Sequence, residues 1–243
     1  MNGTLYLIPN SLGPGTLEAI LPAPVREITA GLDYFIAENA KTARAFLKLV
    51  AETHALGRPL QEIEIRELNV KTASTDVPAL LQPLLAGRDA GLVSEAGVPA
   101  VADPGADLVR LAHEKNITVR PLVGPSSLLL ALMASGLNGQ SFAFNGYLPV
   151  DANERSSRLR QLEQRSRQEK QTQIFIETPY RNQALLEAMV THCAAGTLIS
   201  IATDLTLPGE SVRTQTTSAW KRELDAHRGP DLQKKPTVFL MLA

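Results

Sequence analysis

The chain has 243 residues, of which 44% are hydrophobic, so it can bury the core of one large or two small domains, which excludes a globally disordered protein. Its 24 basic and 25 acidic side chains give a net charge of −1, which argues against a bulk coat of nucleic acid but leaves room for a local basic patch. The single cysteine, Cys193, excludes a disulfide scaffold and a zinc site made of several cysteines.

The sequence predicts a soluble protein of the reducing cytoplasm. Its longest apolar runs fall well short of the roughly 18 residues that span a membrane. The first residues, MNGTLYLIPNSLG, carry no basic region ahead of their apolar run, unlike a secretory signal.

Short apolar runs alternate with helical patterns in the first half of the chain. The runs predict strands at residues 5–8, 34–37, 90–94 and 117–123. The patterns between them predict helices at residues 42–53, 77–85 and 106–115. Strands separated by helices of this length predict a parallel α/β sheet.

The second half of the chain has a different pattern. We expect strands at residues 142–144, 172–177, 197–203 and 237–242, and helices at residues 156–168 and 182–194. The last strand contains the continuous apolar run VFLML, which indicates burial within a sheet. A strand gives way to a very apolar helix near Gly124, so we place the domains at residues 1–123 and 124–243.

Several common catalytic motifs are absent from the sequence. It has neither a Walker A loop nor a G-x-G-x-x-G phosphate loop, and it lacks H-E-x-x-H and G-x-S-x-G. The acidic-Gly-x-Gly-x-Gly loop of the commonest methyltransferases is also missing. The four histidines are scattered along the chain, so we expect no metal centre.

The segment GLVSEAGVPAVADPG, residues 91–105, carries the strongest signal. An apolar strand leads into a loop in which Gly97 can adopt positive φ and two prolines fix φ and remove amide donors. Open α/β sheets bind ligands at the carboxyl ends of their strands, so the loop as a whole predicts a ligand site. Asp103 on its own is more simply explained as the N-cap of the following helix.

Two further segments place polar groups at predicted strand ends. In VGPSSLLLALMASG, the hydroxyls of Ser126 and Ser127 either receive a polar ligand group or cap the helix that follows. In IFIETPYR, the Glu177 carboxylate suits proton transfer or the binding of a donor group, whereas a surface ion pair with Arg181 is an equally good explanation.

The order of these motifs resembles one known family. GTLYLIP, LVSEAGVPAVADPG, VRPLVGPSSLLLAL, FAFNGYLP, IFIETPYRN and the TVFLML end match, in sequence order and across nearly the whole chain, the tetrapyrrole (corrin/porphyrin) methylases. Within that family the chain most resembles the branch of ribosomal small-subunit RNA 2′-O-methyltransferases.

The resemblance implies a class III methyltransferase fold of two α/β domains, with S-adenosylmethionine bound in the interdomain cleft. It also implies a homodimer. The positions that match the family's cofactor-contacting residues are Pro9, Leu12, Gly97, Val98, Val101, Ser126, Ser127, Ile176, Ala202, Pro236 and Thr237.

The sequence departs from the RNA branch on the side expected to bind the methyl acceptor. The branch usually reads A-E-D-T-R where residues 37–41 read AENAK, and R-E-L-T-K where residues 203–207 read TDLTL. It also has Gly-Thr-Pro where this chain has Gly97-Val98-Pro99. A changed substrate or a loss of activity therefore remains open.

Methyl transfer to a hydroxyl needs an oriented acceptor and a group that takes the proton. Glu177 is the first candidate for this role, with Glu95, Glu38 and Asp204 as weaker ones. Each of these side chains is equally well explained as a structural hydrogen-bond acceptor.

The candidate substrate-binding residues are arginines. Residues 153–170 form a basic helical pattern in which Arg155 and Arg158 share one face, and Arg181 follows Glu177. Arginines suit ribosomal RNA, or the small ribosomal subunit, and also a tetrapyrrole with several carboxylates. Three functions stay open: an RNA methyltransferase, a tetrapyrrole methyltransferase, and a cofactor-binding paralogue without activity.

Overall fold

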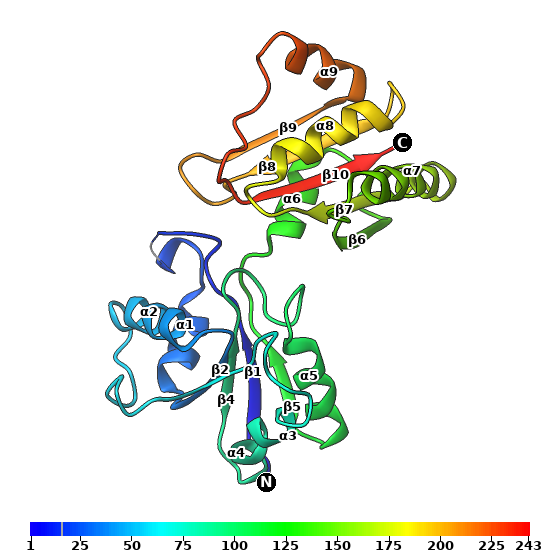
Figure 1. Cartoon of the computed structure of the whole chain (residues 1–243). Coiled ribbons are helices and arrows are strands. Elements are labelled where there is room, and N and C mark those ends of the chain that lie inside the picture. Colours follow the sequence, from blue (N-terminus) through cyan, green and yellow to red (C-terminus); the bar gives the residue numbers. More distant parts are fainter. Residues whose placement is uncertain (16) are drawn as a thin grey trace. The chain divides into compact units, whose positions relative to one another are not determined.

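The computed structural model describes residues 1–15 and 17–243. Figure 1 shows two compact units, Met1–Ser126 and Ser127–Ala243, each with its own sheet. Sequence analysis placed the joint three residues earlier, between residues 123 and 124. Among the described residues, none of the helices combines the length and the apolar character that crossing a membrane demands.

The first unit contains a five-stranded sheet in the order β3-β2-β4-β1-β5. Its strands are β1 (Thr4–Ile8), β2 (Tyr34–Ala37), β3 (Glu64–Glu67), β4 (Ala90–Val93) and β5 (Thr118–Pro121). All four neighbouring pairs are parallel, which confirms the predicted sheet type. Sequence reasoning missed β3, because this edge strand reads EIRE and has a single apolar residue.

Helices cover both faces of this sheet. They are α1 (Ala23–Gly31), α2 (Ala40–Ala51), α3 (Val77–Leu80), α4 (Gln82–Leu85) and α5 (Gly105–Glu114), with a 3-10 turn at Leu17–Ala19. The single helix predicted at residues 77–85 is wrong. Pro83 has no N–H to donate to the carbonyl four residues earlier, so α3 ends before it and α4 starts anew.

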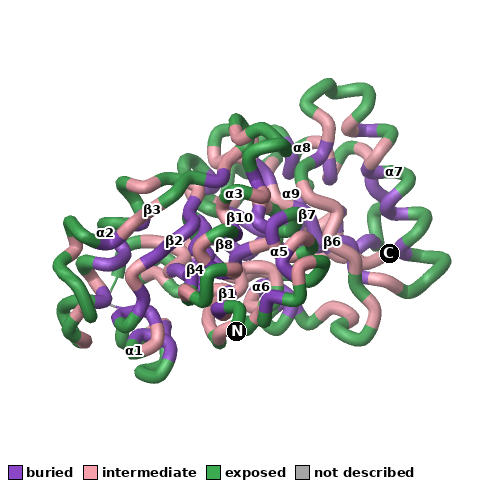
Figure 2. Tube along the Cα trace, turned by 90° about the horizontal axis from the view of Figure 1, so that it is seen from below, coloured by how far each residue is buried: buried purple, intermediate pink, exposed green. Residues whose placement is uncertain are grey.

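The core of the first unit has one layer on each face of the sheet. Side chains of α1 and α2 pack with Ile8 and Phe35 on one face, and α3, α4 and α5 pack with Leu5 and Ile36 on the other. All four residues of β2 and of β4 are buried, as expected for central parallel strands. The buried residues follow the strands and the inner sides of the helices, and the exposed ones lie mainly on the loops (Figure 2).

The second unit has a mixed sheet in the order β6-β7-β10-β8-β9. Its strands are β6 (Phe142–Tyr147), β7 (Thr172–Ile176), β8 (Leu198–Thr203), β9 (Ser211–Thr216) and β10 (Thr237–Leu242). Only the β6–β7 pair is parallel, and β10 runs antiparallel to both of its neighbours. Five of the six residues of β10 are buried, which confirms the prediction for the VFLML run.

The helices of the second unit are α6 (Ser127–Ser135), α7 (Ala152–Glu169), α8 (Asn182–His192) and α9 (Thr217–Asp225). The last three pack over one core that contains Trp220 and Phe239. Helix α6 lies on the other sheet face, where the Thr214 hydroxyl of β9 donates to the Ser135 carbonyl over 2.7 Å. Sequence reasoning did not find β9 or α9, because SVRTQT is a polar edge strand.

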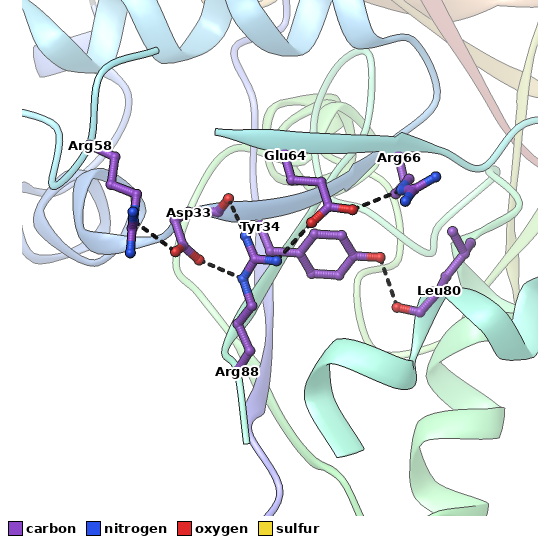
Figure 3. Close-up of polar contacts among 7 residues, drawn as sticks. All are labelled: Asp33, Tyr34, Arg58, Glu64, Arg66, Leu80 and Arg88. Carbon is purple, nitrogen blue, oxygen red and sulfur yellow. Dashed lines mark hydrogen bonds and ion pairs between the residues drawn. The ribbon is translucent and has the colours of Figure 1, made fainter. Parts of the chain in front are cut away.

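One arginine links three strands of the first unit at their amino ends (Figure 3). The Arg88 guanidinium donates to the Asp33 carboxylate over 2.8 Å, to the Asp33 carbonyl over 2.8 Å and to the Glu64 carboxylate over 2.7 Å. It also lies 5.0 Å from the centre of the Tyr34 ring, whose hydroxyl donates to the Leu80 carbonyl. The starts of β2, β3 and β4 are therefore joined by a single side chain.

The Arg88 hydrogen bond is the largest cause that lowers the pKa of Glu64 below its usual 4.5. A carboxyl whose pKa is lowered on folding stabilises the fold above its unfolded pKa, and this contribution is lost as the pH falls through the folded value. The ion pair thus contributes at neutral pH and fades in acid.

We expect Arg88→Met to lower the free energy of unfolding by about 1–2 kcal/mol at pH 7, since both partners are about one-third exposed and partly screened. Urea unfolding at pH 7 and pH 3 measures the effect, and the difference from the unmodified chain should shrink at pH 3. Arg66→Met is the control, because Arg66 is 63% exposed and, among the described residues, its one ion pair is with the Glu64 carboxylate. Equal losses in the two variants, or a loss independent of pH, would contradict the assignment.

Candidate functional site

The carboxyl ends of β1 and β4 form the first candidate site region. The two strands are neighbours, yet the chain leaves β1 for α1 on one sheet face and leaves β4 for α5 on the other. Ligands of open parallel sheets bind where neighbouring connections diverge in this way. The loops at residues 9–12 and 94–104 start at this point.

Asn10 joins these two loops. Its backbone N–H donates to the Gly97 carbonyl over 2.8 Å, and the Gly97 N–H donates back over 3.2 Å. Its side-chain amide donates to the carbonyls of Ser94 and Glu95 over 3.1 and 3.2 Å, and its oxygen accepts from the Ser11 N–H. Sequence reasoning missed Asn10, because its partners are backbone carbonyls about 85 residues away.

The structure brings several predicted cofactor residues of the first unit together. A Cβ placed on Gly97 would lie 3.3 Å from the Leu12 side chain and 3.7 Å from the Pro125 carbonyl. A Cβ on Gly124 would overlap Pro9 at 2.3 Å. Packing therefore excludes a side chain at position 124, whereas at position 97 the contact is only tight and the φ of +71° is what favours glycine.

The loop after β4 is held in a strained shape by one carboxylate. Gly97, Ala100 and Ala102 have φ of +71°, +65° and +61°, a region that alanine rarely adopts. The Asp103 carboxylate accepts from the Ala100 N–H at 2.8 Å and from the Gly105 N–H at 2.7 Å. The expected N-cap role of Asp103 is wrong, since the residue at the N-cap of α5 is Pro104. Asp103 instead joins the Ala100 amide to the first amide of the helix and so fixes the loop.

Carboxylates gather at the same edge of the first unit. Burial is the main cause that raises the pKa of Glu38, and the charges of Asp103 and Glu95 raise it further. Burial also raises the pKa of Asp103. Asn39, which stands where the RNA branch usually has Asp, still caps α2 by accepting from the N–H of Lys41 at 2.8 Å.

The second candidate site region is the edge of the other sheet where β7 and β8 end and β10 begins. Strand register pairs Val238 with both Ile176 and Ala202, so these predicted residues lie on either side of the start of β10. The Pro236 carbonyl accepts from the Asp204 N–H at 3.1 Å, and Thr237 is the first residue of β10. The structure therefore gathers these four predicted residues at one edge.

Glu177 lies at this edge and pairs with Arg181. One carboxylate oxygen, Oε2, accepts from the Arg181 Nη2 and from the Thr178 N–H, each at 2.6 Å. The other, Oε1, is buried and has no partner among the described residues. The expected ion pair exists, but it is not a surface pair, since the Glu177 side chain is 1% exposed.

The predicted arginines of α7 differ in the hydrogen bonds that they make within the chain. Arg155 donates to the Val150 carbonyl over 2.8 Å and is half-buried. Arg158 reaches Asn145 and Gln161 only at 3.4 and 3.5 Å, the long limit of a hydrogen bond. Arg158 is therefore freer than Arg155 or Arg181 to contact a ligand.

Ser126 and Ser127 stand at the division between the two units and are half-buried. No side-chain hydrogen bond of either serine is found among the described residues. Within the same part of the chain, no group of His, Cys, Asp and Glu is arranged to hold a metal ion.

The residues present fit S-adenosylmethionine, the cofactor that the resemblance implies. That molecule presents hydroxyl, amino, carboxylate and adenine groups, which need both donors and acceptors. In the first unit the N–H groups of Val98, Val101 and Ala102 make no hydrogen bond to other described residues. In the second unit Ile176, Ala202, Pro236 and Thr237 are small or apolar, which suits an adenine ring.

The sequence is similar to the sequences of named methyltransferases. The chain is 32% identical over 208 residues to the "Ribosomal RNA small subunit methyltransferase I" of Streptococcus pyogenes serotype M3, which covers 84% of this chain and 66% of that protein. It is 34% identical over 218 residues to the protein of that name from Mesorhizobium japonicum, covering 88% and 68%. The chain thus spans about two thirds of the length of these relatives.

Solved structures share the fold. The methyltransferase CobJ superposes with a TM-score of 0.62 at 18% identity, over 99% of this chain and 94% of that one. Cobalt precorrin-4 methyltransferase, CbiF, superposes with a TM-score of 0.59 at 14% identity, over 98% and 94%. The pattern of the family "Tetrapyrrole (Corrin/Porphyrin) Methylases" matches residues 4–219, and the chain therefore belongs to the tetrapyrrole (corrin/porphyrin) methylase family.

Proposed function

We propose that the chain is an S-adenosylmethionine-dependent methyltransferase that acts on the 2′-hydroxyl of a nucleotide in small-subunit ribosomal RNA. The observation that carries this proposal is the 32–34% identity, over more than four fifths of the chain, to relatives named ribosomal RNA small subunit methyltransferase I. We also place the reaction in the cytoplasm, since ribosomal RNA is processed there in bacteria.

We assign cofactor contacts to the residues gathered at the two sheet edges. Backbone groups of the 94–104 loop supply donors, and the small or apolar residues at the start of β10 supply a surface for the adenine ring. The assigned residues are Pro9, Leu12, Gly97, Val98, Val101, Ser126, Ser127, Ile176, Ala202, Pro236 and Thr237.

When bound, S-adenosylmethionine would supply a methyl group carried on its sulfonium sulfur. An acceptor oxygen would attack the methyl carbon in line with the carbon–sulfur bond. We assign Glu177 to the acceptor side of this reaction. Its Oε2 is fixed by Arg181 and by the Thr178 amide, so Oε1 is left with a defined direction. With the cofactor and an acceptor bound, Oε1 would accept the proton that the acceptor hydroxyl loses on taking the methyl group.

The RNA itself is assigned to the basic side of α7. Arg158, whose guanidinium has only long contacts within the chain, is the first candidate for a phosphate contact. Arg155 and Arg181 already bind the Val150 carbonyl and the Glu177 carboxylate. We therefore assign them to holding these loops in place for the substrate and not to contacting the RNA directly.

The chain should transfer labelled methyl groups from S-adenosylmethionine to small ribosomal subunits isolated from cells that lack this protein. Nuclease digestion of the product should give label in a 2′-O-methylated nucleoside. A porphyrinogen serves as the parallel acceptor, since this family includes tetrapyrrole methylases. Label in the porphyrinogen alone, or in neither acceptor, would overturn the proposed substrate.

Glu177→Gln should lower kcat by about 10²-fold or more, because the variant has no carboxylate oxygen to take the proton. Affinity for S-adenosylhomocysteine should stay within about twofold, because the proposed role is on the acceptor side. The matched control is Glu187→Gln on the exposed side of α8, which should leave kcat unchanged. A Glu177→Gln variant with full kcat would remove Glu177 from the chemistry.

We further propose that the chain forms a homodimer through an apolar surface of the second unit. On α6, Leu129 is 51% exposed and Met133 is 79% exposed. Phe142 of β6 is 43% exposed. Phe144, two residues further along β6, stands in the same row across the sheet as Thr214, which hydrogen-bonds α6. Alternate residues of a strand share a face, so Phe142 lies on the same face of the sheet as α6. A second copy of the same surface would bury these side chains.

Sedimentation at micromolar concentration should give twice the mass of the chain, and Met133→Asp should shift it toward one chain. The exposed Val70 of the first unit provides a control in Val70→Asp, which should leave the mass unchanged. A monomeric unmodified chain would contradict the proposed dimer and would leave the methyltransferase proposal intact.

A further inference from the structure

Asn182, the first residue of α8, is fully buried and makes an unusual set of contacts. Its Nδ2 lies 2.8 Å from the Lys235 carbonyl, 3.0 Å from the Thr237 hydroxyl and 3.3 Å from the Leu232 carbonyl. These partners are 50 to 55 residues away in the sequence. One side chain therefore binds the whole segment that leads into β10.

The contacts define which end of the amide faces the segment. Two of the three neighbours are carbonyl oxygens, which only accept hydrogen bonds, so the donor Nδ2 must point toward them. The opposite atom, Oδ1, is buried and has no partner among the described residues. The fold thus uses the donor side of Asn182 and leaves its acceptor unpaired.

The segment that Asn182 holds has few other restraints. Pro236 has no N–H, so it donates nothing to a neighbour. The Lys235 N–H reaches the Leu232 carbonyl only at 3.4 Å, a long hydrogen bond. The Thr237 hydroxyl also donates to the Lys235 carbonyl, at 3.0 Å, within the same turn. Asn182 is therefore the hydrogen-bonded link between this turn and α8, beside the packing of the Leu232 side chain into the core.

The same turn is connected to the loop after β8. The Pro236 carbonyl accepts from the Asp204 N–H at 3.1 Å. The Lys235 ammonium lies 3.9 Å from the Asp204 carboxylate and 3.4 Å from that of Asp231. A displaced turn would consequently move Asp204 as well, so the position of this edge depends on how firmly Asn182 holds Lys235.

Asn182 also follows directly after the turn that contains Glu177. Within that turn the Arg181 N–H donates to the Thr178 carbonyl at 2.9 Å, and the Arg181 guanidinium binds Glu177. Through Asn182, this acceptor-side turn is tied to the start of β10. The end of β7, the start of α8 and the start of β10 are thus joined by hydrogen bonds.

We propose that Asn182 is a positioning residue that holds Pro236 and Thr237 in the geometry required to bind S-adenosylmethionine. The inference rests on the proposed function, which assigns those two residues to the cofactor. Asn182 is fully buried and contacts Thr237 directly, so we assign it a role through that turn and not through the substrate. Its role is preorganisation, which strengthens binding by removing the need to order the turn when the cofactor arrives.

The test compares Asn182→Ala and Asn182→Ser with Gln183→Ala. Gln183 is the next residue of α8 but is exposed, and within the described part of the chain its side chain hydrogen-bonds Glu187 alone, so its variant controls for changes in the helix itself. Asn182→Ser keeps a hydroxyl donor and leaves a smaller cavity, which provides a folded variant if alanine does not fold.

Three quantities are measured: the Kd for S-adenosylhomocysteine by calorimetry, kcat at saturating S-adenosylmethionine, and amide hydrogen exchange of the cofactor-free protein. We expect the Kd to rise at least about fivefold in Asn182→Ala and less in Asn182→Ser, because the turn must be ordered on binding. Exchange should become faster at Lys235, Thr237 and Asp204, while kcat stays within about twofold.

A melting temperature that falls while the Kd stays unchanged would show a purely structural role and would overturn the inference. Unchanged exchange at Lys235 and Asp204 would overturn it as well, because the turn would then be held by other contacts. If the unmodified chain and Gln183→Ala both fail to bind S-adenosylhomocysteine, the proposed function fails, and this inference fails with it.

Discussion

The adjacent parallel strands β1 and β4 are followed by helices on opposite faces of the first sheet, and the geometry of the candidate site there depends on how the loops after the two strands are joined. Asn10 joins these loops through a pair of backbone hydrogen bonds to Gly97 and two side-chain hydrogen bonds to the carbonyls after β4. These bonds fix the loop, whose N–H groups at Val98, Val101 and Ala102 have no partner among the described residues.

The amino and carboxyl ends of the first sheet differ in how their polar groups are paired. At the amino ends, Arg88 neutralises Asp33 and Glu64 and stacks on Tyr34, so the polar groups there are satisfied (Figure 3). At the carboxyl ends, strained alanines and carboxylates with raised pKa persist. Strain of this kind survives only where the surrounding contacts fix it, as the Asp103 carboxylate does for Ala100.

The second unit also gathers candidate site residues at one edge of its sheet, but with antiparallel strands. Its edge is formed by strand ends of opposite direction, so the start of β10 lies between the ends of β7 and β8. Asn182 anchors that start, as Asn10 anchors the loop in the first unit. In both units an amide side chain that binds backbone carbonyls holds the geometry, and this leaves the residues assigned to the cofactor free to be small or apolar.

Much of the fold could be predicted because apolar runs are local signals. YFIA and TVFLML are buried strands in the structure, as their composition indicates, whereas the edge strands EIRE and SVRTQT carry too few apolar residues to be recognised. The 91–105 loop was recognisable from its glycines and prolines. Asn10 and Asn182 were not, because their partners are main-chain carbonyls distant in sequence, and such contacts leave no motif.

We propose that the loops at these two sheet edges bind S-adenosylmethionine. Hydrogen exchange followed by mass spectrometry, with and without saturating S-adenosylhomocysteine, tests it most directly, since the readout is local and independent of any methyl acceptor. The account predicts protection of peptides that contain residues 9–12, 97–102 and 236–238, with the β3 edge unchanged. Binding without protection at these segments, or no binding at all, would contradict it.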